Sequence, residues 1–302
     1  MSFATHSRTD YSRALRAELP QLSFLNEPEK ALRTIATAVR CAELVQLSRT
    51  TAPSVSAAES IARKIGARLR RQTEASTDRV ILNEAQSKEL VRAYGIATPR
   101  ETLVNSAQDA VSAADATGYA VVLKVVSAAI PHKSDAGGVL VNLRTADEVR
   151  AGYEAIARKL DAQGLSRLVE GMLVCRHIGG GLELALGIHR DPEMGPVVMA
   201  GIGGVLLELV NDVVFAAPPI SLEKARDLLE RTRAARLLNG YRGAPARDVE
   251  AVVEALVALG RMAADLDDVI ESLDINPFVA LGRGEGALAL DALAILARRS
   301  ID

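Results

Sequence analysis

The chain has 302 residues, enough for roughly two domains with cores of their own, so neither disulfides nor a structural metal are needed to stabilise it. Hydrophobic residues make up 49% and charged residues 25%, which is ordinary for a globular protein. A formal net charge of −2 at pH 7 is not that of a nucleic-acid binder. With 3% aromatic residues and no tryptophan, the chain also offers few platforms on which bases could stack.

The cysteines and the apolar runs indicate in which cellular compartment the protein is expected. Cys41 and Cys175 lie far apart without the spacing of metal ligands, which fits a reducing compartment better than a disulfide framework. The polar N-terminus has no apolar signal region. The uncharged apolar run over 197–207 contains glycines and is about half of the ~20 residues that a membrane helix needs. We expect a cytoplasmic protein without a membrane segment.

The first 75 residues are predicted to form an appendage without a complete core. One amphipathic helix is expected from Pro28 to about Val45, and a polar linker follows over 48–54. A second helix is expected over 61–71. Its basic face is either solvated or a partner site, and it carries Arg63, Lys64, Arg68, Arg70 and Arg71.

Residues 76–168 are predicted to form a first α+β lobe. Its helices should begin at capping pairs, namely Asn83 with Gln86, Ser106 with Asp109, and Thr145 with Glu148. The expected elements are helices over 83–95, 106–118 and 145–160 and strands over 120–126 and 139–143.

Residues 169–302 are predicted to form a second lobe. The turn Asp191–Gly195 predicts a hairpin, and mixed strands and helices favour an α+β fold over an all-parallel sheet. The expected elements are strands over 172–174, 182–188, 197–199 and 206–214, helices over 221–238 and 247–264, and strands over 275–281 and 287–291.

Lys124 lies within the apolar strand 120–126, where an unpaired ammonium is costly. Either it has an anionic partner such as phosphate, or its stem reaches solvent from an edge strand. The loop that follows offers donors and closely approaching backbone, the features of a phosphate site, through His132, Lys133, Gly137 and Gly138. Its spacing matches neither the P-loop nor the dinucleotide fingerprint.

Several blocks in order, over about residues 80–296, resemble the ATP-grasp part of the NDP-forming acyl-CoA synthetases. This group includes ADP-forming acetyl-CoA synthetase and, more distantly, succinyl-CoA synthetase. Residues 20–47 resemble, more weakly, the end of the CoA-ligase domain that precedes this module in fused members. The main blocks are 82–96, Val122-Leu123-Lys124, 132–139, Arg190-Asp191-Pro192, 195–204, Gly240-Tyr241-Arg242-Gly243 and Asp274-Ile275-Asn276-Pro277.

The resemblance implies an ATP-grasp fold with subdomains over about 76–168 and 169–302, and ATP or ADP with Mg²⁺ as cofactors. The phosphate-site residues would be Lys124, Lys133, Gly137 and Gly138, and those of the adenine hinge Val174, Cys175 and Ile178. Glu183 would face the ribose, while Asn276 and Asp291 would hold magnesium through oxygen ligands. Two simpler alternatives stay open: Asn276 as a turn residue before Pro277, and Asp291 as the N-cap of a helix beginning at Ala292.

In the resembled family the phosphoryl group passes between ATP, histidine and an acyl phosphate. His132 would be a catalytic relay, or a neutral loop histidine that hydrogen-bonds phosphate, and Asp274 would orient an incoming histidine. The resemblance implies a phosphoryl-transferring part of a reversible ADP-forming acid–CoA ligase. Its CoA-binding partner would supply CoA and a small carboxylic acid. The alternative is a non-catalytic regulatory or scaffold module.

Overall fold

The computed structural model describes residues 3–5, 24–26, 32, 57–76, 78–130, 133, 136–204 and 212–297. The chain divides into two compact units, 1–52 and 53–302. In the first unit, β1 (Phe3–Thr5) and β2 (Phe24–Asn26) pair in parallel. The helix predicted over 28–45 falls outside the described residues, apart from Leu32, which is helical.

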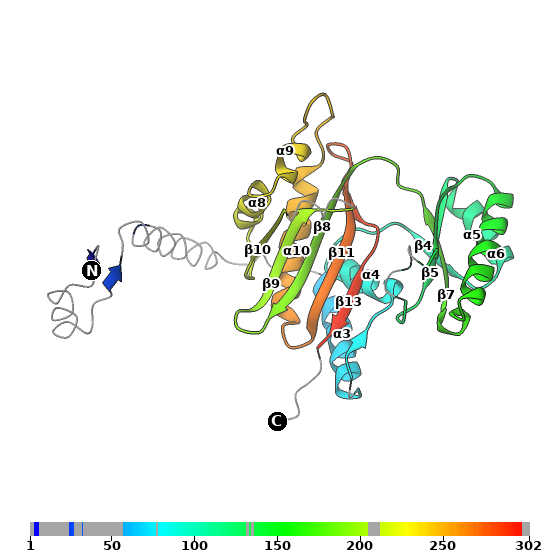
Figure 1. Cartoon of the computed structure of the whole chain (residues 1–302), viewed down its shortest axis with the longest axis horizontal. Helices are drawn as coiled ribbons and strands as arrows, with labels where there is room; N and C mark the ends of the chain where they lie inside the picture. Colours follow the sequence, from blue (N-terminus) through cyan, green and yellow to red (C-terminus); the bar gives the residue numbers. More distant parts are fainter. Residues whose placement is uncertain are drawn as a thin grey trace. The chain divides into compact units, whose positions relative to one another are not determined.

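The second unit contains two sheets, each with helices against it (Figure 1). Within the described residues the larger sheet has seven strands in the order β10-β9-β8-β11-β13-β3, with β12 paired to β11. Its strands are β3 (Val80–Ile81), β8 (Leu182–Asp191), β9 (Gly195–Ile202), β10 (Val213–Ala216), β11 (Ile270–Ala280), β12 (Ala287–Ala289) and β13 (Leu293–Leu296). The four-stranded sheet has the order β4-β7-β5-β6, with β4 (Glu101–Val104), β5 (Val121–Val126), β6 (Val139–Leu143) and β7 (Gly171–Arg176).

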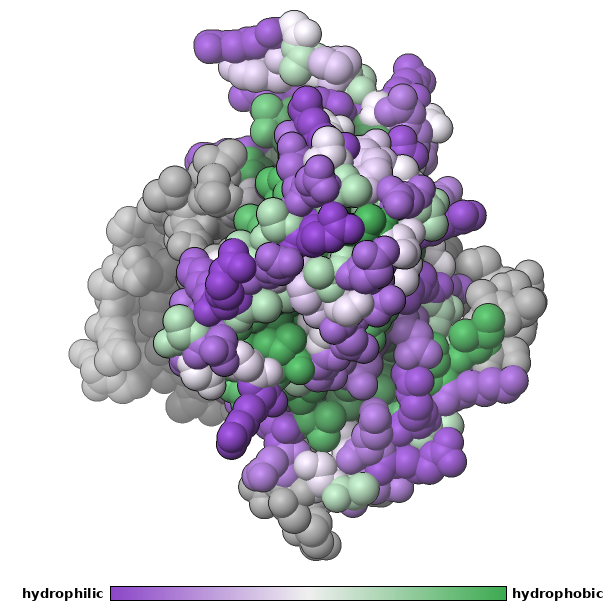
Figure 2. All heavy atoms as spheres, turned by 90° about the vertical axis from the view of Figure 1, so that its right-hand side faces the viewer, coloured by the Kyte–Doolittle hydropathy of each residue, from purple (hydrophilic) through white to green (hydrophobic). Residues whose placement is uncertain are grey.

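The helices pack according to the periodicity of their apolar residues. Those of the larger lobe are α3 (Ala57–Glu74), α4 (Glu84–Ala93), α8 (Leu222–Glu230), α9 (Ala234–Leu238) and α10 (Val249–Asp265). Against the four-stranded sheet lie α5 (Ala107–Thr117) and α6 (Ala146–Ala162), and the short helix η1 (Ser166–Leu168) precedes β7. Figure 2 shows mostly hydrophilic residues over the side of the molecule on which the four-stranded lobe lies. Each lobe therefore has its own apolar core.

The three predicted capping pairs are confirmed. Asn83 Oδ1 accepts from the Gln86 N–H at 3.0 Å, and Gln86 Oε1 accepts from the Asn83 N–H at 3.0 Å, a complete capping box. The Ser106 and Thr145 hydroxyls accept from the N–H groups of Asp109 and Glu148 and so cap α5 and α6, without the reciprocal bond of a capping box. These local contacts begin helices at the predicted places.

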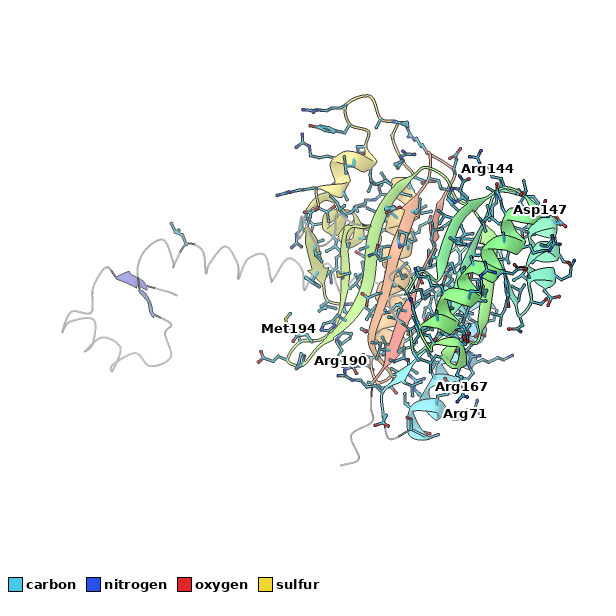
Figure 3. All side chains as sticks on the ribbon, turned by 45° about the vertical axis from the view of Figure 1, so that its right-hand side comes forward. Arg71, Arg144, Asp147, Arg167, Arg190 and Met194 are labelled. Atoms are coloured by element: carbon cyan, nitrogen blue, oxygen red, sulfur yellow. The ribbon has the colours of Figure 1, made fainter. Side chains whose placement is uncertain are left out.

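The predicted hairpin is also confirmed, because β8 and β9 pair antiparallel from Leu184↔Ile202 to Asp191↔Gly195. The turn between them is closed by Asp191, whose Oδ1 accepts from the Met194 N–H at 2.8 Å. Figure 3 places Arg190 and Met194 at this hairpin, whereas Arg144 and Asp147 lie at the start of α6 in the other lobe.

Some expectations differ from the structure. The helix predicted over 221–238 is two helices, because the buried Thr232 hydroxyl donates to Leu229 O at 2.7 Å and accepts from the Ala235 N–H at 3.3 Å. The strand predicted over 206–214 falls mostly outside the described residues, and β10 begins at Val213. The short strands β3 and β4 and the final strand β13 were not predicted.

The lobe boundaries differ too. Expected with the second lobe, β7 lies between β4 and β5 in the four-stranded sheet, whereas β3 and α4 belong to the larger lobe. The apolar face of α3, with Leu69 fully buried, joins the larger core, so the compact unit begins at Pro53 and not near residue 76. The basic face of α3 is partly used within the unit, since Arg68 pairs with Glu89 and Arg70 with Asp268.

Candidate functional site

Lys124 lies on a central strand, because β5 pairs with both β6 and β7. The edge-strand alternative is therefore wrong. Its ammonium donates to Glu84 Oε1 at 3.1 Å and to the backbone oxygen of Leu290 at 2.7 Å. The predicted anionic partner exists, and it is a carboxylate of the other lobe. The neighbouring side chains of β5 point into the core beneath α5 and α6, namely Val121, Leu123 and Val125.

The loop after β5 is tied back onto that strand. The Gly138 N–H donates to Lys133 O at 2.7 Å, and Gly138 O accepts from the Val125 N–H at 2.8 Å. Gly137 has φ +69°, and a Cβ there would collide with the end of the Lys159 side chain. The Lys133 ammonium pairs with Glu84 and lies 3.5 Å from Asp291 Oδ1. His132 falls outside the described residues.

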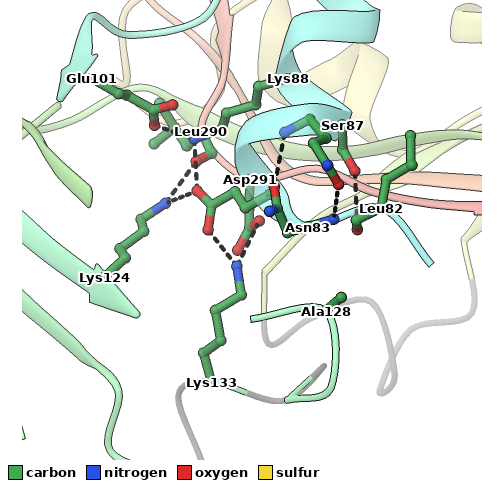
Figure 4. Close-up of polar contacts among 12 residues, drawn as sticks. Leu82, Asn83, Ser87, Lys88, Glu101, Lys124, Ala128, Lys133, Leu290 and Asp291 are labelled. Carbon is green, nitrogen blue, oxygen red and sulfur yellow. Dashed lines mark hydrogen bonds and ion pairs between the residues drawn. The ribbon is translucent and has the colours of Figure 1, made fainter. Parts of the chain in front are cut away.

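Three charged residues of the site were not predicted: Glu84, Lys88 and Glu101. Glu84 is in the first turn of α4, and Oε1 accepts from the Lys88 ammonium at 2.7 Å, one helical turn further on. Lys88 also pairs with Glu101 of β4. Side-chain exposure is 0% for Glu84 and Lys88 and 5% for Glu101, so all three charges are satisfied inside the protein. Figure 4 shows Lys88 and Glu101 together with Lys124, Lys133 and Asp291.

The lysines set the ionisation of the cluster. Burial alone would raise the pKa of Glu84, but Lys124, Lys88 and Lys133 outweigh it and hold this pKa well below its usual range. Burial would lower the pKa of Lys124, but Glu84 and Asp291 raise it above its ordinary value. Burial and the negative Glu84 raise the pKa of Asp291. Glu84 is thus a carboxylate and Lys124 an ammonium at neutral pH.

A polar contact also ties the start of α4 to the four-stranded lobe. Asn83 Nδ2 donates to Glu170 Oε2 at 2.7 Å, and Glu170 Oε1 accepts from the Ala128 N–H at 3.0 Å. The boundary between the lobes is therefore polar and charged where the predicted phosphate residues meet.

The strand pair β11 and β12 brings the two predicted magnesium ligands to this boundary. Phe278 pairs with Ala289, and one residue further on the Leu290 N–H donates to Pro277 O at 3.0 Å. The same antiparallel register places Asp291 opposite Asn276 on the two neighbouring segments. Asp291 is followed by β13, so the helix N-cap alternative is wrong. Asn276 lies within β11, where the pairing register with β8 shifts between Ile275 and Phe278, and it is not a turn residue.

These oxygens suit a hard cation that also takes ligands from phosphate and water. The side chain of Asp291 is 34% exposed, and its only described ion pair is the 3.5 Å contact with Lys133. Asn276 Oδ1 accepts from the Gly204 N–H at 3.1 Å and keeps a further lone pair. No group of three or more His, Cys, Asp or Glu among the described residues could hold a metal by itself. The donor set therefore fits Mg²⁺ bound together with a phosphate ligand.

Glu183 and Asp274 lie on the same sheet as Asn276. A Cβ on Gly204 would collide with the Glu183 carboxylate, so Glu183 and Asn276 meet at the Gly204 backbone. Asp274 and Asn276 alternate with the buried Leu273 and Ile275, which places them on the sheet face away from the core. Desolvation raises the pKa of Asp274.

The predicted adenine hinge spans the end of β7 and the segment that follows it. The side chain of Val174 is fully buried against the helices of its lobe, so Val174 could contact a ligand only through its backbone. Cys175 pairs with Val122 and Glu101 and lies on the same sheet face as Lys124, and burial raises the pKa of its thiol. Ile178 is half-buried in the connection from β7 to β8. Of the hinge residues, Cys175 faces the Lys124 side of the sheet.

Residues 73–296 match the family model described as ATP-grasp domain. The chain belongs to the ATP-grasp domain family. The predicted fold class and resemblance are thereby confirmed. This ATP-grasp chain is 33% identical over 218 residues to the "Acetate--CoA ligase [ADP-forming] II subunit beta" of Pyrococcus furiosus, a match covering 72% of this chain and 92% of that relative.

Two other similarities are informative. A trans-feruloyl-CoA synthase from an unknown prokaryotic organism is 41% identical over 218 residues, covering 72% of this chain but 31% of that relative, so the ATP-grasp chain matches about a third of it. The solved structure of the dinucleotide-forming acetyl-coenzyme A synthetase 1 of Ca. Korarchaeum cryptofilum, in complex with coenzyme A, Ca-AMPCP and HgCl+, has a TM-score of 0.70 and 36% identity, covering 76% of this chain and 98% of that one. Within the described residues, no helix has the length and apolar character to cross a membrane.

Proposed function

We propose that this ATP-grasp chain binds Mg-ATP at the boundary of its two lobes and performs the phosphoryl-transfer half of a reversible acid–CoA ligase reaction. In that reaction acid, CoA and ATP interconvert with acyl-CoA, ADP and phosphate. The observation that carries the proposal is the convergence of the Lys124 and Lys133 ammoniums, from the four-stranded lobe, on groups of the other lobe. These groups are the Glu84 carboxylate, the Leu290 oxygen and Asp291. Relatives named as acid–CoA ligases favour this function over a non-catalytic module.

Each residue has a defined part in the proposal. Lys124 and Lys133 would bind phosphate oxygens, with the tied Gly137-Gly138 loop presenting its backbone to them. Cys175 and the backbone beside it would contact the base, and Glu183 the ribose. Asn276 and Asp291 would hold Mg²⁺, which would neutralise charge on the phosphates. Positioning and electrostatic stabilisation by these groups would carry most of the catalysis.

The transfer itself is assigned to histidine. His132 would accept the phosphoryl group on a neutral ring nitrogen, with ADP as the leaving group, and pass it on. Asp274 would orient the histidine of a CoA-binding part. That part is either a separate subunit, as the name of the Pyrococcus relative suggests, or a further domain as in the longer feruloyl-CoA synthase. CoA and the carboxylic acid would bind there, and we keep the cytoplasm as the predicted location.

The test is a labelling experiment with γ-labelled ATP and Mg²⁺, with and without a CoA-binding part. We expect a label on the chain that is labile to acid and stable to base, lost in H132A and strongly reduced in K124M. Label that survives in H132A, with the chain tested alone, would remove the relay role. Absence of Mg-dependent ATP binding in calorimetry would overturn the proposed function as a whole.

A further inference from the structure

The Glu84 carboxylate is an unexpected neighbour for phosphate-binding lysines. A carboxylate in a phosphate site repels the ligand, and yet Glu84 contacts both Lys124 and Lys133. Its side-chain exposure is 0%, so a ligand that enters the site meets the lysines and not Glu84. Glu84 therefore makes its contacts with the two lysines, and it is through their positions that it can favour a ligand.

Geometry gives Glu84 control over both ammoniums. Oε1 accepts from Lys124 at 3.1 Å, while Oε2 accepts from Lys133, so one rigid carboxylate holds two flexible side chains that come from a strand and from the loop after it. A free lysine side chain has many rotamers to lose on binding a ligand, and two free ammoniums would repel each other. A carboxylate between them removes both difficulties before a ligand arrives.

Lys88 keeps Glu84 in place. It is fully enclosed and bonds Glu84 Oε1 at 2.7 Å from the next turn of α4. On its other side Lys88 pairs with Glu101 of β4, so the carboxylate is held from both lobes. Because Lys88 is not exposed, its ammonium has no access to a ligand. Its single positive charge is shared between the carboxylates of Glu84 and Glu101, so one negative charge remains for the two further ammoniums that Glu84 contacts.

We propose that Glu84 is a positioning residue for the nucleotide site, and that the enclosed Lys88 holds its carboxylate so that the Lys124 and Lys133 ammoniums are set together toward incoming phosphate. This inference rests on the proposed function for the identity of the ligand, but the arrangement of the lysines can be measured without any ligand. Glu101 supports the arrangement from the four-stranded sheet.

The test compares E84Q with E89Q in the full chain. Glu89 lies on the same helix but pairs with Arg68 at the surface, so E89Q is a matched control. The first readout is ligand-free: amine labelling followed by peptide mass spectrometry, with the exposed Lys64 as internal reference. We expect labelling of Lys124 and Lys133 to rise severalfold in E84Q and to stay unchanged in E89Q. Unchanged labelling of both lysines in folded E84Q overturns the inference.

The second readout is Mg-ATP affinity by calorimetry. E84Q should raise the Kd about tenfold, the loss expected for weakened charge-assisted contacts. In a K124M background the same change should have a clearly smaller effect, because Glu84 acts through that lysine. Tighter binding in E84Q, or an equal effect in both backgrounds, contradicts the positioning role.

Two safeguards keep the outcomes separate. If E84Q does not fold, E84D replaces it. The aspartate keeps the charge, but its shorter side chain should not reach both lysines, so labelling of Lys124 and Lys133 should still rise. Unchanged labelling of both lysines in E84D then overturns the inference. If the unmodified chain does not bind Mg-ATP, the proposed function fails, while the labelling result decides the positioning of the lysines. If it binds and E84Q matches it in both readouts, the inference fails and the proposed function stands.

Discussion

The Lys88 ammonium lies 2.7 Å from the Glu84 carboxylate, and neither side chain is exposed to solvent. The second partner of Lys88 is Glu101, on the other lobe. Because α4 packs into the larger core and β4 belongs to the four-stranded sheet, this buried charge cluster joins the two lobes beside the candidate site. Both the stability of the chain and the geometry of the site should depend on it.

Replacing Lys88 with methionine should therefore destabilise the fold strongly. K88M leaves Glu101 without its partner in a buried place, and breaking a buried pair in this way costs about 3–5 kcal/mol of unfolding free energy. The double variant K88M/E101Q should recover much of the loss, because it removes the uncompensated charge. Urea unfolding measures both, with K64M on the exposed face of α3 as control. A K88M protein as stable as K64M would show that Lys88 does not balance a buried charge on Glu101.

Lys124 should matter for nucleotide binding far more than for folding. In K124M, Glu84 still has Lys88 and Lys133, so no buried charge is left alone. Loss of a charge-assisted contact to phosphate should lower Mg-ATP affinity by about one to two orders of magnitude. Calorimetry measures the affinity and thermal unfolding the stability. Affinity equal to that of K64M would show that Lys124 does not contact the nucleotide.

The magnesium assignment predicts a change in metal requirement. D291N removes the charge of one oxygen ligand, and N276A removes the other ligand, so each should need roughly tenfold more Mg²⁺ for half-maximal nucleotide binding. Titrating Mg²⁺ at fixed ATP measures this, and D161N, at the surface near the end of α6, is the control. An unchanged requirement in both variants would place the metal elsewhere.

Much of the fold follows from local sequence. The helix starts at Asn83, Ser106 and Thr145 depend on contacts within four residues, and the β8–β9 hairpin on a short turn. The order of the strands could not be predicted from local sequence. β7 joins the four-stranded sheet by pairing with β4, and the paired residues are about seventy positions apart in the sequence. The predicted lobe boundary failed for that reason.

The candidate site was predictable where one residue contradicts its surroundings, as Lys124 does in an apolar strand. Glu84 and Lys88 gave no such signal, because an acid in the first turn and a lysine one turn later are typical of an exposed helix. Their charges are paired inside the protein by Glu101 and the β5 residue Lys124, which lie far from them in the sequence. The predicted helix that begins at Asn83 was the one feature of the sequence that pointed to this part of the chain.

Substitutions at Gly137 and Gly164 should separate an effect on stability from an effect on Mg-ATP binding. Gly137 and Gly164 have φ of +69° and +71°, so alanine at either position should cost about 1 kcal/mol of stability. At Gly164 a Cβ meets open space, whereas at Gly137 it displaces the end of Lys159 and disturbs the loop that bears Lys133. We expect G137A but not G164A to weaken Mg-ATP binding in calorimetry. Equal affinities in the two variants would separate this loop from the site.

The lowered pKa of Glu84 predicts how the unfolding free energy of the chain decreases at acid pH. An unfolded glutamate titrates near 4.5, while the folded-state pKa of Glu84 lies well below that value. The unfolded chain therefore binds the proton first as pH falls, so the contribution of Glu84 is fully present above about pH 4.5 and is lost below it. E84Q should be less stable than the unmodified chain at pH 7, and the difference should shrink from pH 4.5 downward.

Asp274 provides the contrasting case. Because its pKa is raised above 3.8, its contribution to stability is present at low pH and lost as pH rises through the folded-state value. D274N should therefore gain stability relative to the unmodified chain as pH rises above 3.8, whereas the difference between E84Q and the unmodified chain changes only below about pH 4.5. Urea unfolding at half-unit pH steps from 3 to 7, without Mg²⁺ or nucleotide, follows both variants. A difference between E84Q and the unmodified chain that stays constant across this range would show that Glu84 is not held by the lysines in solution.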